Sequence, residues 1–444
     1  MAGSYLLSAI FHSLSTILYL LSSIYPPLFA MRILLLTPQR PYPPHQGTTL
    51  RNFNLVKELA KRHSVCVLTF LEPDQNPHDP GPLADLCEWV ETVPLPQRST
   101  GLRLRQMLTT RRPDMSLRLW SPELNARLTA RLSEQPFDVV EIEGIEMAPY
   151  LPTLEAAQPR PLIVYDAHNA EWILQKRACL ADLKNPARWL AAAYSWVQWH
   201  RLRRYEADLL RRVDHTIAMS HPDKVALRDV APDVSITVVP NGVDPAAYNE
   251  LGEVIYYDLL FTGKMDFRPN IDAVLWFGRS VLPLILERRP GTTFAIVGQR
   301  PHPRLNILRD TPGVTITGYV DDVRPYLAGA RVYVAPLRVG GGTRLKLLEA
   351  MAMGKPIVST AVGAEGFPVI NGQELILADE PENFAREVLD LLENPTRRAR
   401  LAATGRAFAQ ANYGWDKLVP QLEKIYHNRR PLTPSTSSGQ AADR

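Results

Sequence analysis

Residues 331–360, RVYVAPLRVGGGTRLKLLEAMAMGKPIVST, run through a strand pattern, a glycine-rich turn, a helical pattern and a second strand pattern. The apolar runs at 331–337 and 356–360 are continuous rather than alternating, which is typical of parallel strands covered on both faces. Apolar residues recur at helical spacing between them, and Gly354 with Pro356 ends the helix. The stretch predicts one unit of a doubly wound α/β domain.

The turn inside this stretch is a candidate anion site. It holds three consecutive glycines, Gly340, Gly341 and Gly342. Glycines let a backbone approach a ligand closely, and Thr343 is a good N-cap for the helix that follows. The positive end of a helix dipole favours an anion, and Arg344 or Lys346 adds a full positive charge. We expect a phosphate or diphosphate here, although the glycine run alone also fits an ordinary flexible turn.

A carboxylate on the same helix indicates a second contact. Glu349 lies about one turn after Lys346, on the same face. A carboxylate would repel phosphates, but it accepts two hydroxyl hydrogen bonds, as a ribose would offer. Because neither a Walker A pattern nor G-x-G-x-x-G is present, the usual signatures of an ATPase or a dinucleotide-binding enzyme are missing.

Similar apolar runs alternate with helical patterns through most of the chain and form two series. The first series is expected at 32–38, 64–70, 137–143, 161–168, 214–220 and 234–240. The second is expected at 257–263, 293–298, 314–320, 331–337, 356–360 and 374–378. We therefore predict two Rossmann-like domains across a cleft, at 31–240 and 257–412, with a linker at 241–256, a helix at 413–429 that could pack back on the first domain, and a disordered tail at 430–444.

Composition is that of a folded protein without a dedicated nucleic-acid surface. Of 444 residues, 45% are hydrophobic and 22% charged, and the net charge is only +4. The three cysteines, Cys66, Cys87 and Cys179, show no metal-ligand spacing, so we expect reduced thiols in a cytoplasmic protein.

Residues 1–30 are an apolar segment that leaves two alternatives open. Positions 5–24 carry no formal charge and are long enough to cross a bilayer, but serine, threonine and His12 dilute them. Met31 then opens the first strand pattern without a spacer. The segment is either a membrane anchor or the product of a start assigned upstream of Met31.

Four motifs together resemble one family. They are GGGTRLKLLEAMAMGKPIVST, FTGKMDFRPNIDAVLWF, VPNGVD and AMSHPDKV. They resemble the GT-B retaining glycosyltransferases of the family 4-like, group 1 type, over residues 31–428. The resemblance implies a C-terminal domain that binds a nucleotide-diphosphate sugar and an N-terminal domain that binds the acceptor. It implies no bound metal and no other cofactor.

The resemblance also implies roles for residues of the C-terminal domain. Glu349 matches the glutamate that holds the ribose, and Lys346 matches a cation for the diphosphate. Gly263 and Lys264, at the tip of the first strand of that domain, are expected to face the same cleft. Many relatives carry a further glutamate eight positions before Glu349, where this chain has Gly341. Recognition of the transferred sugar by this loop is therefore the least defined part of the site.

Two residues of the N-terminal domain complete the predicted site. Gly47, at an expected helix start, allows that helix N-terminus to face the diphosphate from the opposite wall. Relatives often have two adjacent glycines here, whereas this chain has Gln46 and Gly47. His168 follows a strand end, where ligands of such sheets collect. Alone it would more often be a structural hydrogen-bonding group, but the resemblance implies a contact with the donor sugar or acceptor.

Three other patterns have simpler interpretations. Asp321 and Asp322 could be a metal pair, but helix capping explains them better. Trp189, Trp196 and Trp199 have helical spacing, and we expect a core stripe. Residues 101–120 mix arginine with leucine, methionine and tryptophan. This mixture fits a solvated face or an anionic membrane surface that carries a lipid-linked acceptor.

The sequence therefore predicts a hexosyltransferase that uses a nucleotide sugar and acts in cell-surface polysaccharide or glycoconjugate synthesis, in the cytoplasm or at the inner face of the membrane. Two rivals remain. A nucleotide-sugar 2-epimerase of the same fold would form its product without an acceptor. A non-catalytic subunit would bind the donor without turnover.

Overall fold

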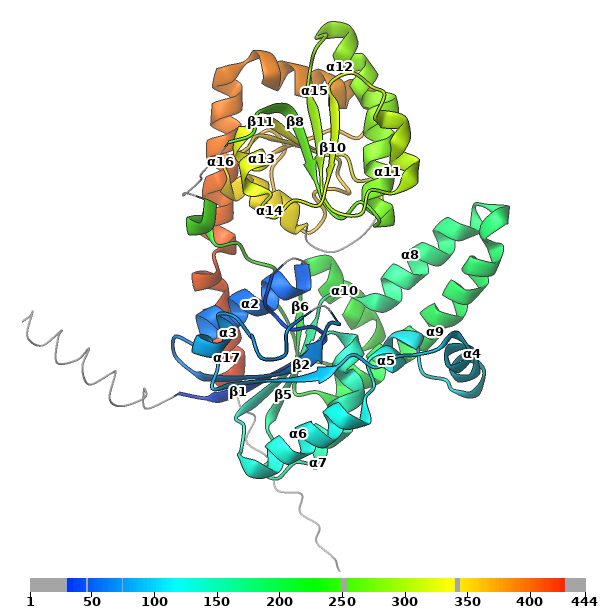
Figure 1. Cartoon of the computed structure of the whole chain (residues 1–444), viewed down its shortest axis with the longest axis vertical. Coiled ribbons are helices and arrows are strands. Elements are labelled where there is room, and N and C mark those ends of the chain that lie inside the picture. Colours follow the sequence, from blue (N-terminus) through cyan, green and yellow to red (C-terminus); the bar gives the residue numbers. More distant parts are fainter. Residues whose placement is uncertain (1–29, 45–46, 74, 249–253, 340–343, 428–444) are drawn as a thin grey trace, which may run out of the picture.

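The structure is a computed structural model of the whole chain, and it describes residues 30–44, 47–73, 75–248, 254–339 and 344–427. Two parallel sheets, each between layers of helices, lie one above the other in Figure 1. This is the predicted α/β architecture of two doubly wound domains. Within the described ranges, none of the helices combines the length and the apolar character needed to cross a bilayer.

The N-terminal sheet has seven parallel strands in the order β3-β2-β1-β4-β5-β6-β7. The strands are β1 Arg32–Thr37, β2 Ser64–Leu71, β3 Trp89–Pro94, β4 Val139–Glu143, β5 Leu162–Ala167, β6 His215–Ala218 and β7 Ile236–Val238. Its helices are α2 Gly47–Leu59, α3 Leu83–Leu86, α4 Thr100–Thr109, α5 Asp114–Arg118, α6 Pro122–Glu134, α7 Leu151–Ala156, α8 Glu171–Leu183, α9 Trp189–Arg212 and α10 His221–Val230.

The C-terminal sheet has six parallel strands in the order β10-β9-β8-β11-β12-β13. The strands are β8 Tyr257–Thr262, β9 Phe294–Val297, β10 Val314–Gly318, β11 Ala330–Ala335, β12 Ile357–Ser359 and β13 Ile376–Leu377. The helices that follow the linker are α11 Arg268–Trp276, α12 Leu282–Arg288, α13 Arg324–Gly329, α14 Leu345–Ala352, α15 Pro381–Glu393, α16 Pro395–Tyr413 and α17 Trp415–His427.

Continuous apolar strands become buried on both faces, as the sequence pattern predicts. In β1, Leu34 and Leu36 join a core cluster with α6, α7 and α9. Ile33 and Leu35 point to the opposite face and join a second cluster with α2 and α17. Neighbouring residues of one strand therefore pack against two different helix layers. This is why apolar and polar residues do not alternate along the strand.

The chain passes between the domains twice, and the two passages touch. The linker residue Val243 donates its N–H to the carbonyl of Tyr413, at the end of α16, over 2.8 Å. The chain then turns at Gly414 into α17, which packs beside α2 of the N-terminal domain (Figure 1). The last described helix thus completes a core that begins with β1.

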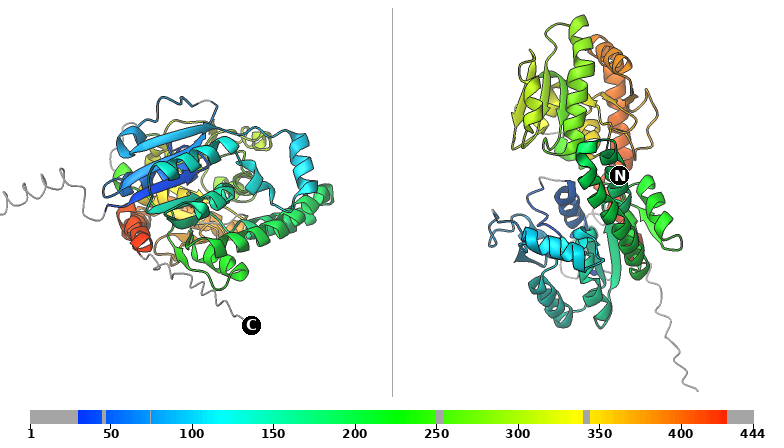
Figure 2. Two further views of the ribbon diagram at one scale, coloured as in Figure 1. Left: turned by 90° about the horizontal axis from the view of Figure 1, so that it is seen from below. Right: turned by 90° about the vertical axis from the view of Figure 1, so that its right-hand side faces the viewer.

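One expected feature of the N-terminal domain is wrong. Trp189 and Trp196 do not belong to a core stripe, because 60% and 54% of their surfaces are exposed. Only Trp199 packs partly against the core. The reason is that α8 and α9 form a hairpin that extends beyond the sheet, so the start of α9 lacks a covering layer (Figures 1 and 2).

Candidate functional site

Both sheets reverse their strand order at one point, which is where ligands of doubly wound folds bind. The reversal lies between β1 and β4 in the first sheet and between β8 and β11 in the second. Gly263 directly follows β8, and His168 directly follows β5, next to β4. The topology therefore places residues from both predicted walls at strand ends that bind ligands in this fold class.

On the C-terminal wall, Lys346 lies in the first turn of α14. Its Nζ donates to Asn270 Oδ1 over 2.8 Å and lies 4.3 Å from the centre of the Phe261 ring. A Cβ added to Gly263 would lie 2.7 Å from Nζ, so a side chain there would displace the ammonium from its place at the end of β8. The positions of Gly263 and Lys346 thus depend on each other.

Burial shifts the acid–base behaviour of this wall. Burial and the neighbouring charge of Arg344 lower the pKa of Lys346 to about 7, against an upward contribution from Glu349. The pKa of Glu349 is raised by burial, while the charge of Lys346 and a hydrogen bond with Tyr248 act in the opposite direction. Near neutral pH Lys346 is therefore divided between the ammonium and the amine, and an arriving anion would favour the ammonium.

Glu349 faces the space between the domains. A cavity of about 210 Å³ is lined by Leu50 and Phe53 of α2, by Tyr248 of the linker and by Glu349 of α14, among others. Glu349 lies one turn beyond Lys346 on α14. A ligand that reached both would extend along the start of α14 into this cavity.

The starts of α2 and α14 face each other across the cleft (Figure 1). A Cβ added to Gly47, the first residue of α2, would lie 3.3 Å from Leu345 Cδ1, at the first residue of α14. The two helix starts therefore lie close together, and the positive ends of two helix dipoles favour an anion near them.

The structure gives fewer contacts for the other residues that were predicted to bind the donor. Lys264 is 42% exposed, and its Nζ lies 3.9 Å from Asp266. Arg344 occupies the N-cap position of α14 without a capping bond from its side chain, so the helix begins later than the sequence predicts. Gly341, Gly342 and Thr343 lie outside the described residues.

On the N-terminal wall, His168 is held by a buried carboxylate. Its Nε2 lies 2.8 Å from Oε2 of Glu143, at the end of β4, and 18% of the histidine side chain remains exposed. Burial lowers the pKa of His168, but the hydrogen bond and charge of Glu143, with the charge of Asp166, outweigh it and raise the pKa above its usual value. The geometry favours an imidazolium with its ring orientation fixed by Glu143.

A buried ion pair supports this arrangement. Arg51, on α2, places Nε and NH2 2.9 and 2.7 Å from Asp166 Oδ2, and it donates from NH1 to the carbonyl of Pro240 over 3.0 Å. Glu141, two residues before Glu143 on β4, accepts from Tyr426 of α17 over 2.5 Å. The wall therefore connects β4 and β5 with α2 and the returning helix α17.

Glu143, Asp166 and His168 are the one group among the described residues whose ligand atoms lie close enough together for a metal ion, within 4.8 Å of one another. The guanidinium of Arg51 already contacts Asp166, and Glu143 is paired with His168. Since these two cations balance the two carboxylates, the residues do not favour an added metal ion. At the other candidate pair, Asp322 accepts the N–H of Arg324 at the start of α13 over 2.8 Å.

Several residues of the site did not emerge from the sequence. Lys346 contacts Asn270, and Glu349 contacts Tyr248. Each contact joins residues of separate elements, so neither could be predicted from a local pattern. Glu141 and Glu143 did carry a signal, because carboxylates in an otherwise apolar buried strand are rare unless they are paired. Arg51 lies one turn into α2, and the sequence did not indicate that it would pair with Asp166.

Comparisons with known proteins agree with this architecture. A family model described as Glycosyltransferase Family 4 matches residues 46–247, and one described as Glycosyl transferases group 1 matches residues 256–394. Phosphatidyl-myo-inositol mannosyltransferase of Mycobacterium tuberculosis is 30% identical over 206 residues, 42% of this chain and 53% of that protein. An uncharacterized 44.6 kDa protein in the cps region of Klebsiella pneumoniae is 24% identical over 175 residues, 38% of this chain and 45% of that protein. The matches thus span about half the length of these relatives.

A solved structure shows the same fold. The crystal structure of Anabaena Alr3699/HepE in complex with UDP and glucose superposes with a TM-score of 0.63 at 16% identity, over 90% of this chain and 100% of that one. Each domain of the chain thus matches its own glycosyltransferase model, and the whole has the fold of a solved two-domain protein. The chain belongs to the family 4-like, group 1 glycosyltransferases with a GT-B fold.

Proposed function

We propose that this protein transfers a hexosyl group from a nucleotide-diphosphate sugar to a saccharide or lipid-linked acceptor, with retention at the anomeric carbon, in surface-polysaccharide or glycoconjugate synthesis on the cytoplasmic side of the membrane. The observation that carries the proposal is the start of α14. There Lys346 lies against Gly263, Glu349 faces the cavity between the domains, and the start of α2 lies opposite.

The donor would lie along this helix start. Its diphosphate would contact Lys346 and the N–H groups of α14 and α2, and its ribose would donate two hydroxyl hydrogen bonds to Glu349. Negative charge grows on the diphosphate as the bond to the sugar breaks. A fixed cation and two helix N-termini stabilise that charge without reorganisation, and the proposal includes no metal ion or cofactor.

The acceptor would lie against the N-terminal wall. His168 follows β5 and presents part of its ring to solvent, so it is the proposed contact for the transferred sugar or the acceptor hydroxyl. As the new C–O bond forms on the face that the diphosphate leaves, the acceptor hydroxyl gives its proton to a phosphate oxygen. The protein's part is to hold both partners in one cleft.

The comparisons support the donor class. One fold neighbour was crystallised with UDP and glucose, and one relative is named a mannosyltransferase. Both names agree with a hexose carried by a nucleotide.

The test is turnover of UDP-, GDP- and ADP-hexoses by the full chain, followed as nucleoside diphosphate release and as sugar product. We expect slow release from one donor, loss of that release in Glu349→Ala, and wild-type release in Glu382→Ala, an exposed glutamate of α15. An epimerised nucleotide sugar formed without acceptor would replace the proposal with an epimerase. Donor binding without turnover, even with acceptors present, would replace it with a binding subunit.

A further inference from the structure

Helix α4 is amphipathic but buries none of its side chains. Ser99 caps its start by accepting the N–H of Leu102, so the start of the helix is locally specified. Its leucines are exposed, and Leu108 keeps 75% of its surface in solvent. An isolated helix of 10 residues is marginal in water, and most helices gain stability by covering an apolar face. The apolar face of α4 lacks such a cover among the described residues.

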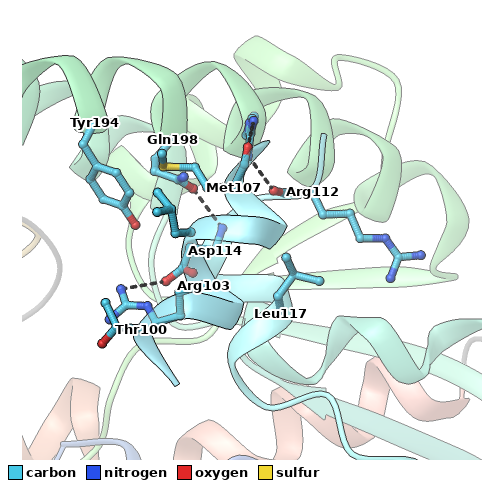
Figure 3. A pocket seen from close by; sticks show the side chains of 10 residues that line it. Thr100, Arg103, Met107, Arg112, Asp114, Leu117, Tyr194 and Gln198 are labelled. Atoms are coloured by element: carbon cyan, nitrogen blue, oxygen red, sulfur yellow. Dashed lines mark hydrogen bonds and ion pairs between the residues drawn. The ribbon is translucent and has the colours of Figure 1, made fainter. Parts of the chain in front are cut away.

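Polar contacts hold α4 beside α9 and leave a cavity of about 170 Å³ between them (Figure 3). Arg201 of α9 donates to the carbonyl of Met107 over 2.7 Å, and Gln198 accepts the N–H of Asp114 over 2.8 Å. Figure 3 shows Gln198 pointing from α9 toward Asp114, the first residue of α5. Apolar residues that include Leu104 and Tyr194 line this cavity, together with charged residues such as Arg103 and Arg201.

The apolar surface continues beyond the cavity on both helices. Leu108 lies one turn after Leu104 on α4, and Leu190 lies one turn before Tyr194 on α9, so each pair shares a helix face. Leu190 keeps 90% of its surface exposed. We call these four residues, with Arg103 and Arg201 at the cavity, the α4–α9 surface. It lies on the side of the N-terminal domain from which the α8–α9 hairpin projects (Figure 1).

The charge around this surface is strongly positive. Between residues 100 and 118, the arginines are Arg103, Arg105, Arg111, Arg112 and Arg118, against the acidic residue Asp114, and one of these arginines, Arg118, lies in an ion pair with Glu146. Two copies of the surface would bring arginines together, which opposes self-association. Anionic headgroups would neutralise the arginines while the leucines enter the boundary between headgroups and acyl chains.

We propose that the α4–α9 surface docks onto a bilayer that contains anionic lipids. The inference deepens the proposed function, on which it rests for a lipid-linked acceptor. Docking would hold the N-terminal domain against the membrane and bring the acceptor wall within reach of a headgroup-linked saccharide.

The first test is partition of the full chain between buffer and vesicles of phosphatidylcholine, alone or mixed with phosphatidylglycerol. In Arg105→Glu/Arg111→Glu, partition onto the mixed vesicles should fall by about tenfold or more, because each basic residue near an anionic surface contributes to binding. Arg279→Glu/Arg400→Glu makes the same charge change at exposed sites of the C-terminal half and should partition as wild type. Equal partition of the two double variants would overturn the proposal.

The second test does not depend on residues 1–30, which could bind vesicles by themselves. A nitrobenzoxadiazole label is attached at Leu108→Cys or at Ile370→Cys, which is 56% exposed in the C-terminal domain, both with Cys87→Ser because Cys66 and Cys179 are buried. Mixed vesicles should shift the emission of the label at 108 to the blue and protect it from an aqueous quencher, while the label at 370 stays unchanged.

Two results of the label experiment would contradict docking. One is no change at position 108 with mixed vesicles. The other is a change at 108 without vesicles that grows with protein concentration, which would assign the surface to a second copy of the chain. Turnover of the donor without acceptor is measured in parallel and should be unchanged in Arg105→Glu/Arg111→Glu. If the protein docks but turns over no donor, the proposed function is wrong while the docking proposal is supported.

Discussion

The two walls of the cleft both hold buried charge, but they balance it differently. On the N-terminal wall, Asp166 pairs with Arg51 and Glu143 pairs with His168, so positive and negative groups meet inside the wall. On the C-terminal wall, the direct contacts of the Lys346 ammonium are the neutral amide of Asn270 and the face of Phe261, and the charge of Glu349 acts on it without a direct ion pair. A buried charge that is paired within the protein stabilises the fold. A buried cation without a direct ion pair can still bind an anion. The difference is the reason for the proposal that the diphosphate binds at the C-terminal wall.

The largest expected effect is on stability, where a buried ion pair is compared with an exposed one. Arg51→Met leaves Asp166 buried without its cation, and it should lower the free energy of unfolding by about 3–5 kcal/mol. Arg338→Met removes an ion pair to Asp272, in which the arginine is 47% exposed, and it should cost about 1 kcal/mol or less. Urea unfolding of both variants checks this. Equal losses would mean that the pair on the N-terminal wall is not a structural one.

The next effect separates two carboxylates of β4 that are equally buried. Glu143→Gln removes the charge that raises the pKa of His168, so the histidine should lose its proton at a lower pH. The limb of the pH–rate profile that reports His168 should move to lower pH, and turnover should fall about tenfold, as when other orienting carboxylates are removed. Glu141→Gln, whose carboxylate contacts Tyr426 instead, should leave the titration of His168 in place. An NMR titration of His168 in both variants decides between these outcomes.

The smallest expected effect is a pH dependence of donor binding on the C-terminal wall. The pKa of Lys346, about 7, lies below its usual value because of burial and Arg344, whereas Glu349 acts in the opposite direction. A bound diphosphate favours the ammonium, so binding takes up a proton above about pH 7 and affinity should fall several-fold between about pH 7 and pH 8. Lys346→Arg stays charged and should remove this dependence. A dependence that persists in Lys346→Arg would assign the proton to another group.

The strands of the fold were predictable because a parallel sheet buries both faces of each strand. The expected apolar runs all became strands, and their alternation with helices predicted two doubly wound domains, whereas the resemblance of four motifs implied the GT-B fold. The exception is β3, Trp89–Pro94, which was not predicted. As an edge strand with one fully buried residue, it shows neither a continuous apolar run nor a buried stripe.

The candidate site was predictable where one local segment carries it and unpredictable where distant segments meet. Lys346 and Glu349 share a helix, so their spacing alone places them on one face. The contact between Arg51 and Asp166 joins residues 115 positions apart, so no local sequence pattern predicts it. The predicted core stripe on α9 was wrong for a related reason. Helical spacing places the tryptophans on one face, but it does not show whether another element covers that face.

Titration calorimetry of the preferred donor against two single variants tests the central claim most directly. Lys346→Ala removes the cation of the C-terminal wall and should weaken donor binding by about tenfold to a hundredfold, the loss expected for a charged hydrogen bond. His168→Ala leaves the proposed contacts of the diphosphate and the ribose in place and removes at most one contact to the transferred sugar, so it should weaken donor binding much less than Lys346→Ala does. Wild-type affinity in Lys346→Ala together with lost affinity in His168→Ala would contradict the account and place the donor on the opposite wall.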